Sequence, residues 1–333
     1  MQVILLSCLL CAAATLQAPE SRLQRLGTLE FQGKVIHGKD ISAICKFGAY
    51  LIVASDEGRT VQVLRPTGPN RYAVHHDIEL PDNGDLAEEV DVEALTADGH
   101  FIYAVGSHAQ RRPKLSDKKT HRENIQRLLE SRVEPARDRL FRFTLNAAGE
   151  LDAVAGVTSI SLRPRLERNP LFQPFLKIPG KENGVNIEAL AIDGQNLIAG
   201  FRGPVFREGH VPVMEFPLDN STLHRIRFVQ LGGLGIRSLE KVSDGFLIIG
   251  GPVGEGPPHF TLFHWDGNDC IPGSDVADPG TLVALGDIPL PSESPGAKPE
   301  GLLVVSESTD AWEVVIVYDS AKDGAPTRFR FAK

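Results

Sequence analysis

The sequence is poor in the residues and short motifs that identify many enzyme classes. Its 333 residues include only two Met and two Trp, and two of its four Cys lie within the first eleven residues. It contains no Gly-x-Ser-x-Gly elbow, no phosphate-binding loop and no His-Glu-x-x-His motif. Its net charge is −8, with a pI near 5.7. That balance argues against a nucleic-acid partner, so we expect none.

Long apolar runs are also missing, apart from one at the N-terminus. Residues 3–16 carry no charge and end in small side chains, which fits a secretory signal peptide over residues 1–18. The run is shorter than the 20 or so residues that a membrane span requires, so we expect no transmembrane span after its removal. No Lys or Arg precedes Val3, which leaves a misplaced start or a buried strand as alternatives. We expect a secreted or periplasmic protein.

Cysteine is scarce in the remaining chain, which contains only Cys45 and Cys270. An even pair could form one disulfide in an oxidising compartment. The alternative is that Cys45, which follows an apolar stretch, is a small buried hydrophobic residue. No Cys-x-x-Cys zinc or redox spacing occurs after residue 18.

A short phrase recurs along the chain and is its most informative feature. Its five copies are Asp40-Ile41-Ser42-Ala43-Ile44, Asp91-Val92-Glu93-Ala94-Leu95, Asn186-Ile187-Glu188-Ala189-Leu190, Gly235-Ile236-Arg237-Ser238-Leu239 and Lys298-Pro299-Glu300-Gly301-Leu302. All but the last are followed by a turn and a second apolar run. A repeat of about 50 residues built from short strands is typical of a propeller blade.

We therefore predict an all-β fold, a β-propeller with five four-stranded blades, in a single domain over residues 19–333. Residues 146–185 or 28–31 could supply a sixth blade or the closing strand. The apolar runs are continuous rather than alternating, which fits strands that are covered on both faces. A β-sandwich would explain the strands but not the repeated phrase. We expect a monomer.

The second repeat contains the clearest helical signal. Thr120 and Glu123 have the spacing of a capping box, and Ile125, Leu128 and Leu129 follow at helical intervals. Residues 111–142 hold eleven Lys or Arg and five Asp or Glu. We predict an insertion in the second blade over residues 107–138. It is either a solvated amphipathic helix that lies over the propeller or a basic arm that docks on an acidic ligand, partner or lipid surface.

One position of the phrase is polar in every copy. It holds Ser42, Glu93, Glu188, Arg237 and Glu300. In a propeller the first strand of each blade lines the central channel, so these side chains should converge near the axis, where unpaired charges are costly. Either Glu93, Glu188 and Glu300 bind a divalent cation such as calcium, or Arg237 neutralises them in a structural network. Asp91 and Asn186 add oxygen atoms next to this position, or simply close turns.

A second zone of interest follows the second strand of each repeat, because loops at blade ends often carry function in propellers. These loops include Ser55-Asp56-Glu57, Gly106-Ser107-His108, Arg202-Gly203-Pro204 and Gly251-Pro252-Val253. His108 is a candidate acid, base or anion contact. The alternative is that it is merely an exposed loop histidine.

Parts of the second and third repeats carry a family resemblance. The phrases Asn186-Ile-Glu-Ala-Leu-Ala191, Leu197-Ile-Ala-Gly-Phe-Arg-Gly-Pro204 and Asp91-Val-Glu-Ala-Leu95, with Val105-Gly-Ser-His108, resemble those of the bacterial domain-of-unknown-function family numbered 3616. The similarity runs from about Phe31 to the C-terminus and implies a propeller without a known reaction. The family usually has Asn where this chain has Gly203, and its Asp-Asp-Glu loop is matched only in part by Ser55-Asp56-Glu57. The Glu-x-Leu phrases are more distantly similar to those of phytase-esterase-like propellers.

Three functions remain open from the sequence. The first is a propeller that binds a small molecule or protein at its axial face, with or without a cation. The candidate ligand-binding residues are Asp91, Glu93, His108, Asn186, Glu188, Arg202, Arg237 and Glu300. The second is a metal-assisted hydrolase of phosphoesters or lactones that uses the same residues. The third is an interaction module that uses the basic segment.

Overall fold

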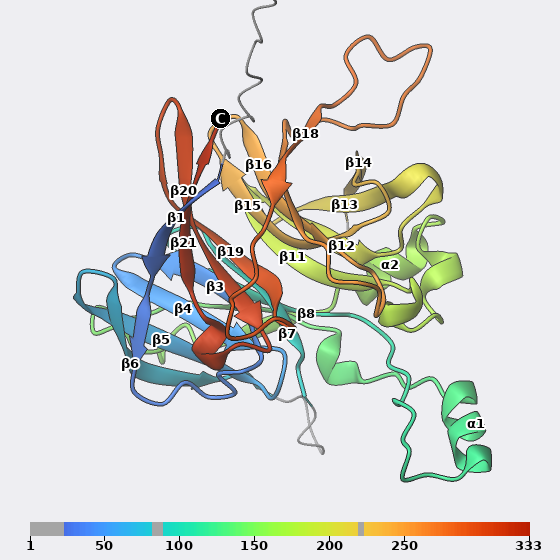
Figure 1. Cartoon of the computed structure of the whole chain (residues 1–333), viewed down its shortest axis with the longest axis horizontal. Coiled ribbons are helices and arrows are strands. Elements are labelled where there is room, and N and C mark those ends of the chain that lie inside the picture. Colours follow the sequence, from blue (N-terminus) through green and yellow to red (C-terminus); the bar gives the residue numbers. More distant parts are fainter. Residues whose placement is uncertain (1–22, 82–88, 219–222) are drawn as a thin grey trace, which may run out of the picture.

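The computed structural model describes residues 23–81, 89–218 and 223–333, and these fold as a five-bladed β-propeller (Figure 1). The innermost strands are β3 (Ile41–Phe47), β7 (Val92–Ala97), β11 (Asn186–Asp193), β15 (Gly235–Val242) and β19 (Lys298–Glu307). Each contacts the next and β19 contacts β3, which closes the ring. The predicted fold is confirmed, and the five sheets exclude the β-sandwich.

The blades are antiparallel sheets that run outward from the axis. Blade 1 adds β4 (Tyr50–Ser55), β5 (Thr60–Gly68) and β6 (Arg71–Glu79) to β3, with the short β2 (Glu30–Gln32) parallel to β6 at its outer edge. Blade 2 adds β8 (Ile102–Gly106), β9 (Leu140–Phe143) and β10 (Thr158–Ile160). Blade 3 adds β12 (Asn196–Gly203), β13 (His210–Pro217) and β14 (Arg225–Gln230). Blade 4 adds β16 (Gly245–Gly251), β17 (Thr261–Trp265) and β18 (Leu282–Asp287).

Blade 5 joins the two ends of the described chain. It adds β20 (Ala311–Asp319) and β21 (Thr327–Ala332) to β19, and its outermost strand is the N-terminal β1 (Leu23–Thr28). No sixth sheet forms in the described residues. Residues 146–185 supply β10, helix α2 (Arg163–Arg168) and the short helices η2 (Gln173–Phe175) and η3 (Gly180–Glu182) instead. The remaining short helices are η1 (Pro135–Arg137), η4 (Arg207–Gly209) and η5 (Lys322–Gly324).

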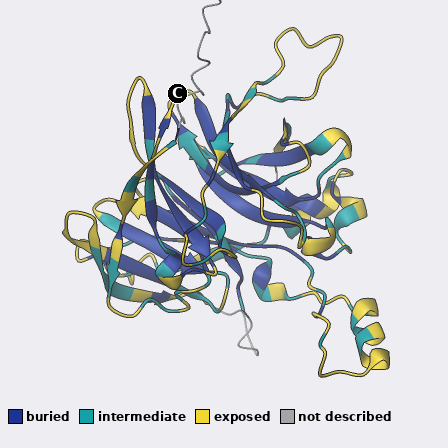
Figure 2. Cartoon of the chain, in the orientation of Figure 1, coloured by how far each residue is buried: buried dark blue, intermediate teal, exposed yellow. Residues whose placement is uncertain are grey.

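The inner strands are buried on both faces, as their continuous apolar runs predict. Figure 2 shows the burial concentrated on the strands around the axis, while exposed positions gather in the loops and on one projecting helix. Neighbouring blades share their apolar side chains, and one core cluster extends from Tyr103 of blade 2 to Trp265 of blade 4. Cys45 is buried and Cys270 is half-buried, and both are free thiols. Burial raises the pKa of the Cys45 thiol, which fits a small buried hydrophobic residue.

The insertion leaves blade 2 between β8 and β9. Its helix α1 (His121–Leu129) has the predicted capping box, in which Thr120 and Glu123 exchange hydrogen bonds. The expectation that this helix lies over the propeller is wrong. None of its residues is buried, and it projects away from the blades (Figure 1). Within the described residues no helix is long and apolar enough to cross a bilayer.

Candidate functional site at the propeller axis

Each inner strand contains a β-bulge, and the bulge falls at the polar position of the phrase. At this position the pairing of each inner strand with its neighbour skips one residue. The five skipped residues are Ser42, Glu93, Glu188, Arg237 and Glu300. A bulge leaves its extra residue outside the regular ladder and re-aims its side chain. The repeated polar position is therefore a repeated backbone irregularity, found in all five blades at the same end of the inner strand.

Four charged residues form one continuous ion-pair chain at this end, which we call the axial network. Arg202 Nη1 lies 2.7 Å from Glu188 Oε1, Arg237 Nη1 lies 3.1 Å from Glu188 Oε2, and the same Nη1 lies 2.8 Å from Glu300 Oε1. Both guanidinium groups also donate to the carbonyl oxygen of Pro252, from the loop that follows β16. Arg237 thus bridges two carboxylates from different blades, as expected if it neutralises them in a structural network.

The two carboxylates of the network differ in acidity because they differ in partners. Burial opposes ionisation of Glu188, but the charges of Arg202 and Arg237 and hydrogen bonds from Arg202 and Asn186 outweigh it and lower its pKa. Glu300 has Arg237 as its one ion-pair partner among the described residues. Burial together with nearby Asp319 and Glu188 raises the pKa of Glu300 to about 7.

Glu93 is the exception among the charged bulge residues. No ion pair or hydrogen bond of its carboxyl group occurs within the described part of the chain. Burial raises its pKa well above the usual value, and the neighbouring carboxyls of Asp91, Glu188 and Glu300 raise it further. These surroundings favour the protonated form of the Glu93 carboxyl group.

Asp56 lies on the acidic side of the site, although the sequence analysis included it only as one residue of its loop. It follows β4, and its Oδ1 is buried without a hydrogen-bond partner. Burial raises its pKa to about 9, with further contributions from Glu300 and Asp91. Nearby Asp91, by contrast, is paired with Arg137, which also pairs with Glu89 and Glu134. Among the residues that the structure describes, Asp56 and Glu93 are therefore carboxyl groups of this site that form no ion pair.

Arg137 is the second site residue that the sequence did not indicate. It lies in a run of basic residues, which usually marks a solvated surface, yet it is buried beneath its three carboxylate partners. The signal that could have found it is its position, since it comes just before the chain re-enters blade 2 at β9.

His108 lies near the axial end, but its surroundings leave no ring nitrogen for a ligand. It is fully buried, its Nδ1 lies 2.9 Å from the carbonyl oxygen of Gly106, and its Nε2 accepts a hydrogen bond from the backbone N–H of Leu162. Burial lowers its pKa to about 4. His108 is therefore not an exposed loop histidine, and its ring is not placed to act as an acid, a base or an anion contact. The geometry makes it a neutral link between blade 2 and the segment that leads into α2.

The predicted cation site fits this geometry poorly. Glu188 and Glu300 are both bonded to Arg237, so two of the three candidate ligands already face a positive charge. Within the described residues no group of three or more His, Cys, Asp or Glu side chains is placed to hold a metal ion. Of the three, only Glu93 has no ion-pair partner among the described residues. The arrangement favours the structural network over a three-carboxylate calcium site.

A small cavity lies beside the network. It has a volume of about 10 Å³, and Glu93, Glu300, Ser42 and Ser238 supply its polar lining. Apolar side chains two positions after each bulge residue close it on the other side, namely Ile44, Leu95, Leu190, Leu239 and Leu302. A volume of this size accommodates about one water molecule or a group of similar size. Unpaired buried polar atoms lie nearby, namely Asn186 Oδ1 and Arg237 Nε.

Gly203 explains one departure from the family pattern. A Cβ atom at this position would lie 2.5 Å from the carbonyl oxygen of Gly184. The loop before β11 approaches the end of β12 so closely that a side chain here would displace it. A glycine in place of the family's usual Asn therefore reflects close backbone packing next to Arg202.

These features are those of a propeller with a polar axial site, and comparison with known proteins identifies the family. The family described as "Protein of unknown function (DUF3616)" matches residues 40–328, so the chain belongs to this family, as the resemblance predicted. No protein with a curated description matches the sequence.

Comparison with solved structures finds matches of low sequence identity. The crystal structure of Myxococcus xanthus glutaminyl cyclase is 10% identical with a TM-score of 0.49, over 93% of this chain and 97% of that one. The N-terminal domain of Nup159 is 9% identical with a TM-score of 0.33, over 88% of this chain and 76% of that one. These likenesses give no information about activity.

Proposed function

We propose that the protein is a binding propeller that takes a small, positively charged group at the axial end, between Glu93 and Asp56. The observation that carries the proposal is the uneven pairing of the five bulge residues. Arg237 neutralises Glu188 and Glu300, whereas Glu93 has no partner although it is surrounded by other carboxyls. Buried carboxyls without partners are costly, and a bound cation would offset that cost.

The size of the cavity and the donor set favour an ammonium head group over a metal ion. A space of about 10 Å³ admits one group about as large as a water molecule. A divalent metal such as calcium would require several oxygen ligands, and the network already holds two of the three candidates. An ammonium group donates three hydrogen bonds and needs only two or three acceptors. Glu93, which lines the cavity, and Asp56, whose charge acts on Glu93 from outside the lining, would supply them in their ionised forms.

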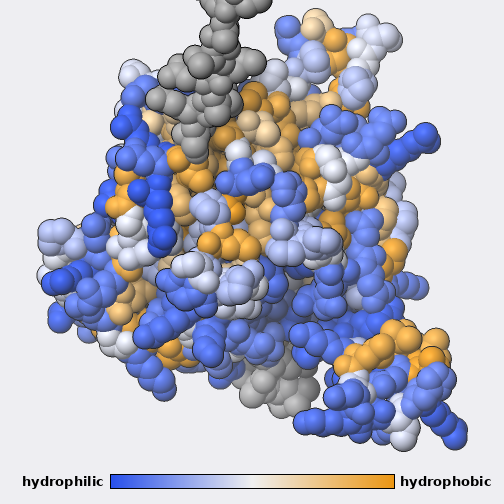
Figure 3. Space-filling model, in the orientation of Figure 1, coloured by the Kyte–Doolittle hydropathy of each residue, from blue (hydrophilic) through white to orange (hydrophobic). Residues whose placement is uncertain are grey.

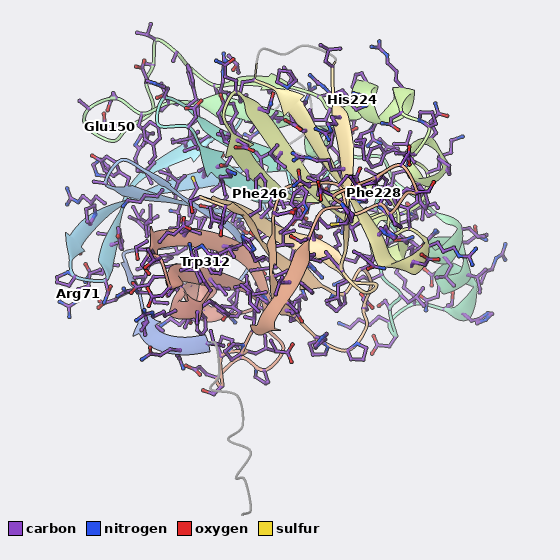
Figure 4. All side chains as sticks on the ribbon, turned by 90° about the horizontal axis from the view of Figure 1, so that it is seen from above. Arg71, Glu150, His224, Phe228, Phe246 and Trp312 are labelled. Carbon is purple, nitrogen blue, oxygen red and sulfur yellow. The ribbon has the colours of Figure 1, made fainter. Side chains whose placement is uncertain are left out.

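Thermal unfolding tests this proposal directly. Ethanolammonium chloride and calcium chloride are added separately to the wild type, to Glu93→Gln and to the control Glu150→Gln, against sodium chloride of equal ionic strength. Glu150 is exposed at the rim of the molecule (Figure 4). We expect ethanolammonium to stabilise the wild type and the control, by about 2.7 kcal/mol at a hundred times its Kd. Glu93→Gln should not respond. Absence of a shift with both probes, or an equal shift in Glu93→Gln, would refute the site.

Proton release gives an independent readout. The pKa of Glu93 is raised above its usual value and that of Asp56 to about 9. A cation bound beside these carboxyl groups lowers their pKa values, so we expect its binding to release protons. Calorimetric titration of ethanolammonium in HEPES and in Tris should give binding enthalpies that differ with the ionisation enthalpy of the buffer. Equal enthalpies in the two buffers would show that the probe binds elsewhere.

A metal-assisted hydrolase is the second candidate, and one observation favours it. Glu93 and Glu188 lie in the same site with pKa values moved in opposite directions, which is the arrangement that separates an acid from a base. The poor fit for a metal counts against it. The test is a screen of phosphoester and lactone substrates with calcium or magnesium, in which activity must disappear in Glu93→Gln.

A further inference from the structure

The insertion in blade 2 carries an exposed apolar surface that the axial site does not explain. We call residues 107–138 the arm. Its apolar face comprises Leu115 (54% exposed), Ile125 (41%), Leu128 (46%), Leu129 (73%) and Val133 (59%). Figure 3 shows a hydrophobic patch on the arm, set apart from the rest of the surface. An apolar patch of this kind on a soluble protein marks an interaction site.

The arm is held in shape by polar contacts, so the exposure of its apolar face does not result from a missing core. A nine-residue helix with no buried side chain is only marginally stable by itself. The capping box fixes the start of α1, and Asn124 exchanges two hydrogen bonds with Ser116. Arg112 donates to the carbonyl oxygens of Leu128 and Glu130 at its end. The same guanidinium pairs with Glu182 of the propeller.

Positive charge accompanies the apolar face. The arm has nine Lys or Arg and five Asp or Glu. Lys114, Lys118 and Arg122 have no carboxylate partner among the described residues. Arg122 is three residues before Ile125 and seven before Leu129, so all three lie on one side of the helix. The acidic residues Glu123 and Glu130 lie seven positions apart on a different row. Within α1, the side that bears Ile125 and Leu129 therefore has a basic residue at its N-terminal end and no acidic one.

We propose that the arm docks on an anionic lipid surface, with its apolar face in the headgroup region and its free cations next to the lipid phosphates. The helix is strongly amphipathic although its mean hydropathy is low, which is the signature of helices that lie in a membrane interface. A stable protein interface uses about 20 to 30 residues a side. The arm offers five apolar residues and three cations on a convex projection, and a lipid surface needs no matching shape.

Charge distribution over the molecule gives this docking an orientation. Residues 242–297 of blade 4 and its loops contain eight Asp or Glu and no Lys or Arg. In Figure 1 the long loop between β17 and β18 lies at the opposite end of the molecule from α1. An anionic surface would attract the arm and repel blade 4.

Vesicle sedimentation of the full chain tests the proposal. Phosphatidylcholine vesicles with and without about 30 mol% phosphatidylglycerol are compared at about 0.05 M and about 0.5 M NaCl. We expect the wild type to bind the anionic vesicles at low salt. Binding should be at least tenfold weaker at high salt. It should also be at least tenfold weaker at low salt in the double variants Leu128→Ser/Leu129→Ser and Lys118→Ser/Arg122→Ser. The matched controls Val154→Ser (99% exposed) and Arg207→Ser (92% side-chain exposure) should bind as the wild type does.

Fluorescence distinguishes insertion from simple charge attraction. Trp265 and Trp312 are both buried, so Leu129→Trp introduces an exposed reporter, whose emission should shift to shorter wavelength on anionic vesicles. Failure to bind anionic vesicles, or equal binding to neutral ones, would overturn the proposal. So would a wild-type dimer in light scattering that Leu128→Ser/Leu129→Ser converts to monomer, which would assign the face to a second copy of the chain. None of these outcomes depends on the axial ligand.

Discussion

Single residues decide the electrostatics of this propeller, and Asp56 shows it most directly. Its pKa is about 9 in the folded chain and about 3.9 when unfolded, so between these values the folded state binds the extra proton. The free energy of unfolding therefore falls as pH rises from about 4 to about 9. We expect Asp56→Asn to weaken this decline and to raise the free energy of unfolding at pH 8 by about 1–3 kcal/mol. Urea unfolding from pH 5 to 9 measures this free energy, and the control Glu150→Gln should show the same pH dependence as the wild type.

Arg237 should have the opposite effect, because its partners remain buried when it is removed. Arg237→Gln would leave Glu188 and Glu300 without their shared cation, and breaking a buried pair in this way costs about 3–5 kcal/mol. Removing Arg330 from its exposed pair with Asp310 should cost less than about 1 kcal/mol. Equal losses in the two variants, measured by urea unfolding, would show that the axial network contributes no more than a surface pair.

At the residue scale the sequence predicted the positions of the network better than its pairing. Alignment of the phrases brought Glu188, Arg237 and Glu300 to one level, and the structure joins them. The sequence could not tell which carboxyl group would remain unpaired, since Glu93 and Glu188 occupy equivalent positions in identical Glu-Ala-Leu phrases. The difference comes from Arg202 on the neighbouring strand and from Arg137 at the end of the insertion. Those contacts depend on three-dimensional packing rather than on the repeat.

At the scale of single elements, the strands were predictable and their irregularities were not. The four strands expected in blade 3 are found as β11, β12, β13 and β14, because turn residues separate each apolar run from the next. The bulge in each inner strand has no signature beyond the polar residue itself. Helix α1 was also predictable from its capping box. Its direction was not, because the same amphipathic pattern suits a helix that covers the propeller and one that leaves it.

The capping box of α1 should matter to the arm alone. Thr120→Ala removes the side-chain acceptor for the backbone N–H of Glu123, which costs about 1 kcal/mol of helix stability. Because α1 buries no residue, we expect faster amide hydrogen exchange over residues 121–129 and an unchanged global Tm. Thr158→Ala, at an exposed position of β10, is the control and should leave exchange in α1 unaltered. A fall in Tm with Thr120→Ala would mean that the arm supports the propeller.

The closure of the ring is a property of the whole molecule, and the repeated phrase did not predict which strand closes it. The first strand of the described chain, β1, pairs with β21 and so completes the blade that the C-terminal strands begin. Deletion of residues 23–28 should expose β21 as a free edge, with the loss of about five ladder hydrogen bonds worth about 1 kcal/mol each. A chain that starts at residue 29 should therefore unfold at a Tm about 5–10 °C lower than one that starts at residue 23, and should associate through its open edge. Scanning calorimetry and light scattering on the two chains measure both effects. Equal Tm values would show that the ring is held by contacts between the inner strands alone.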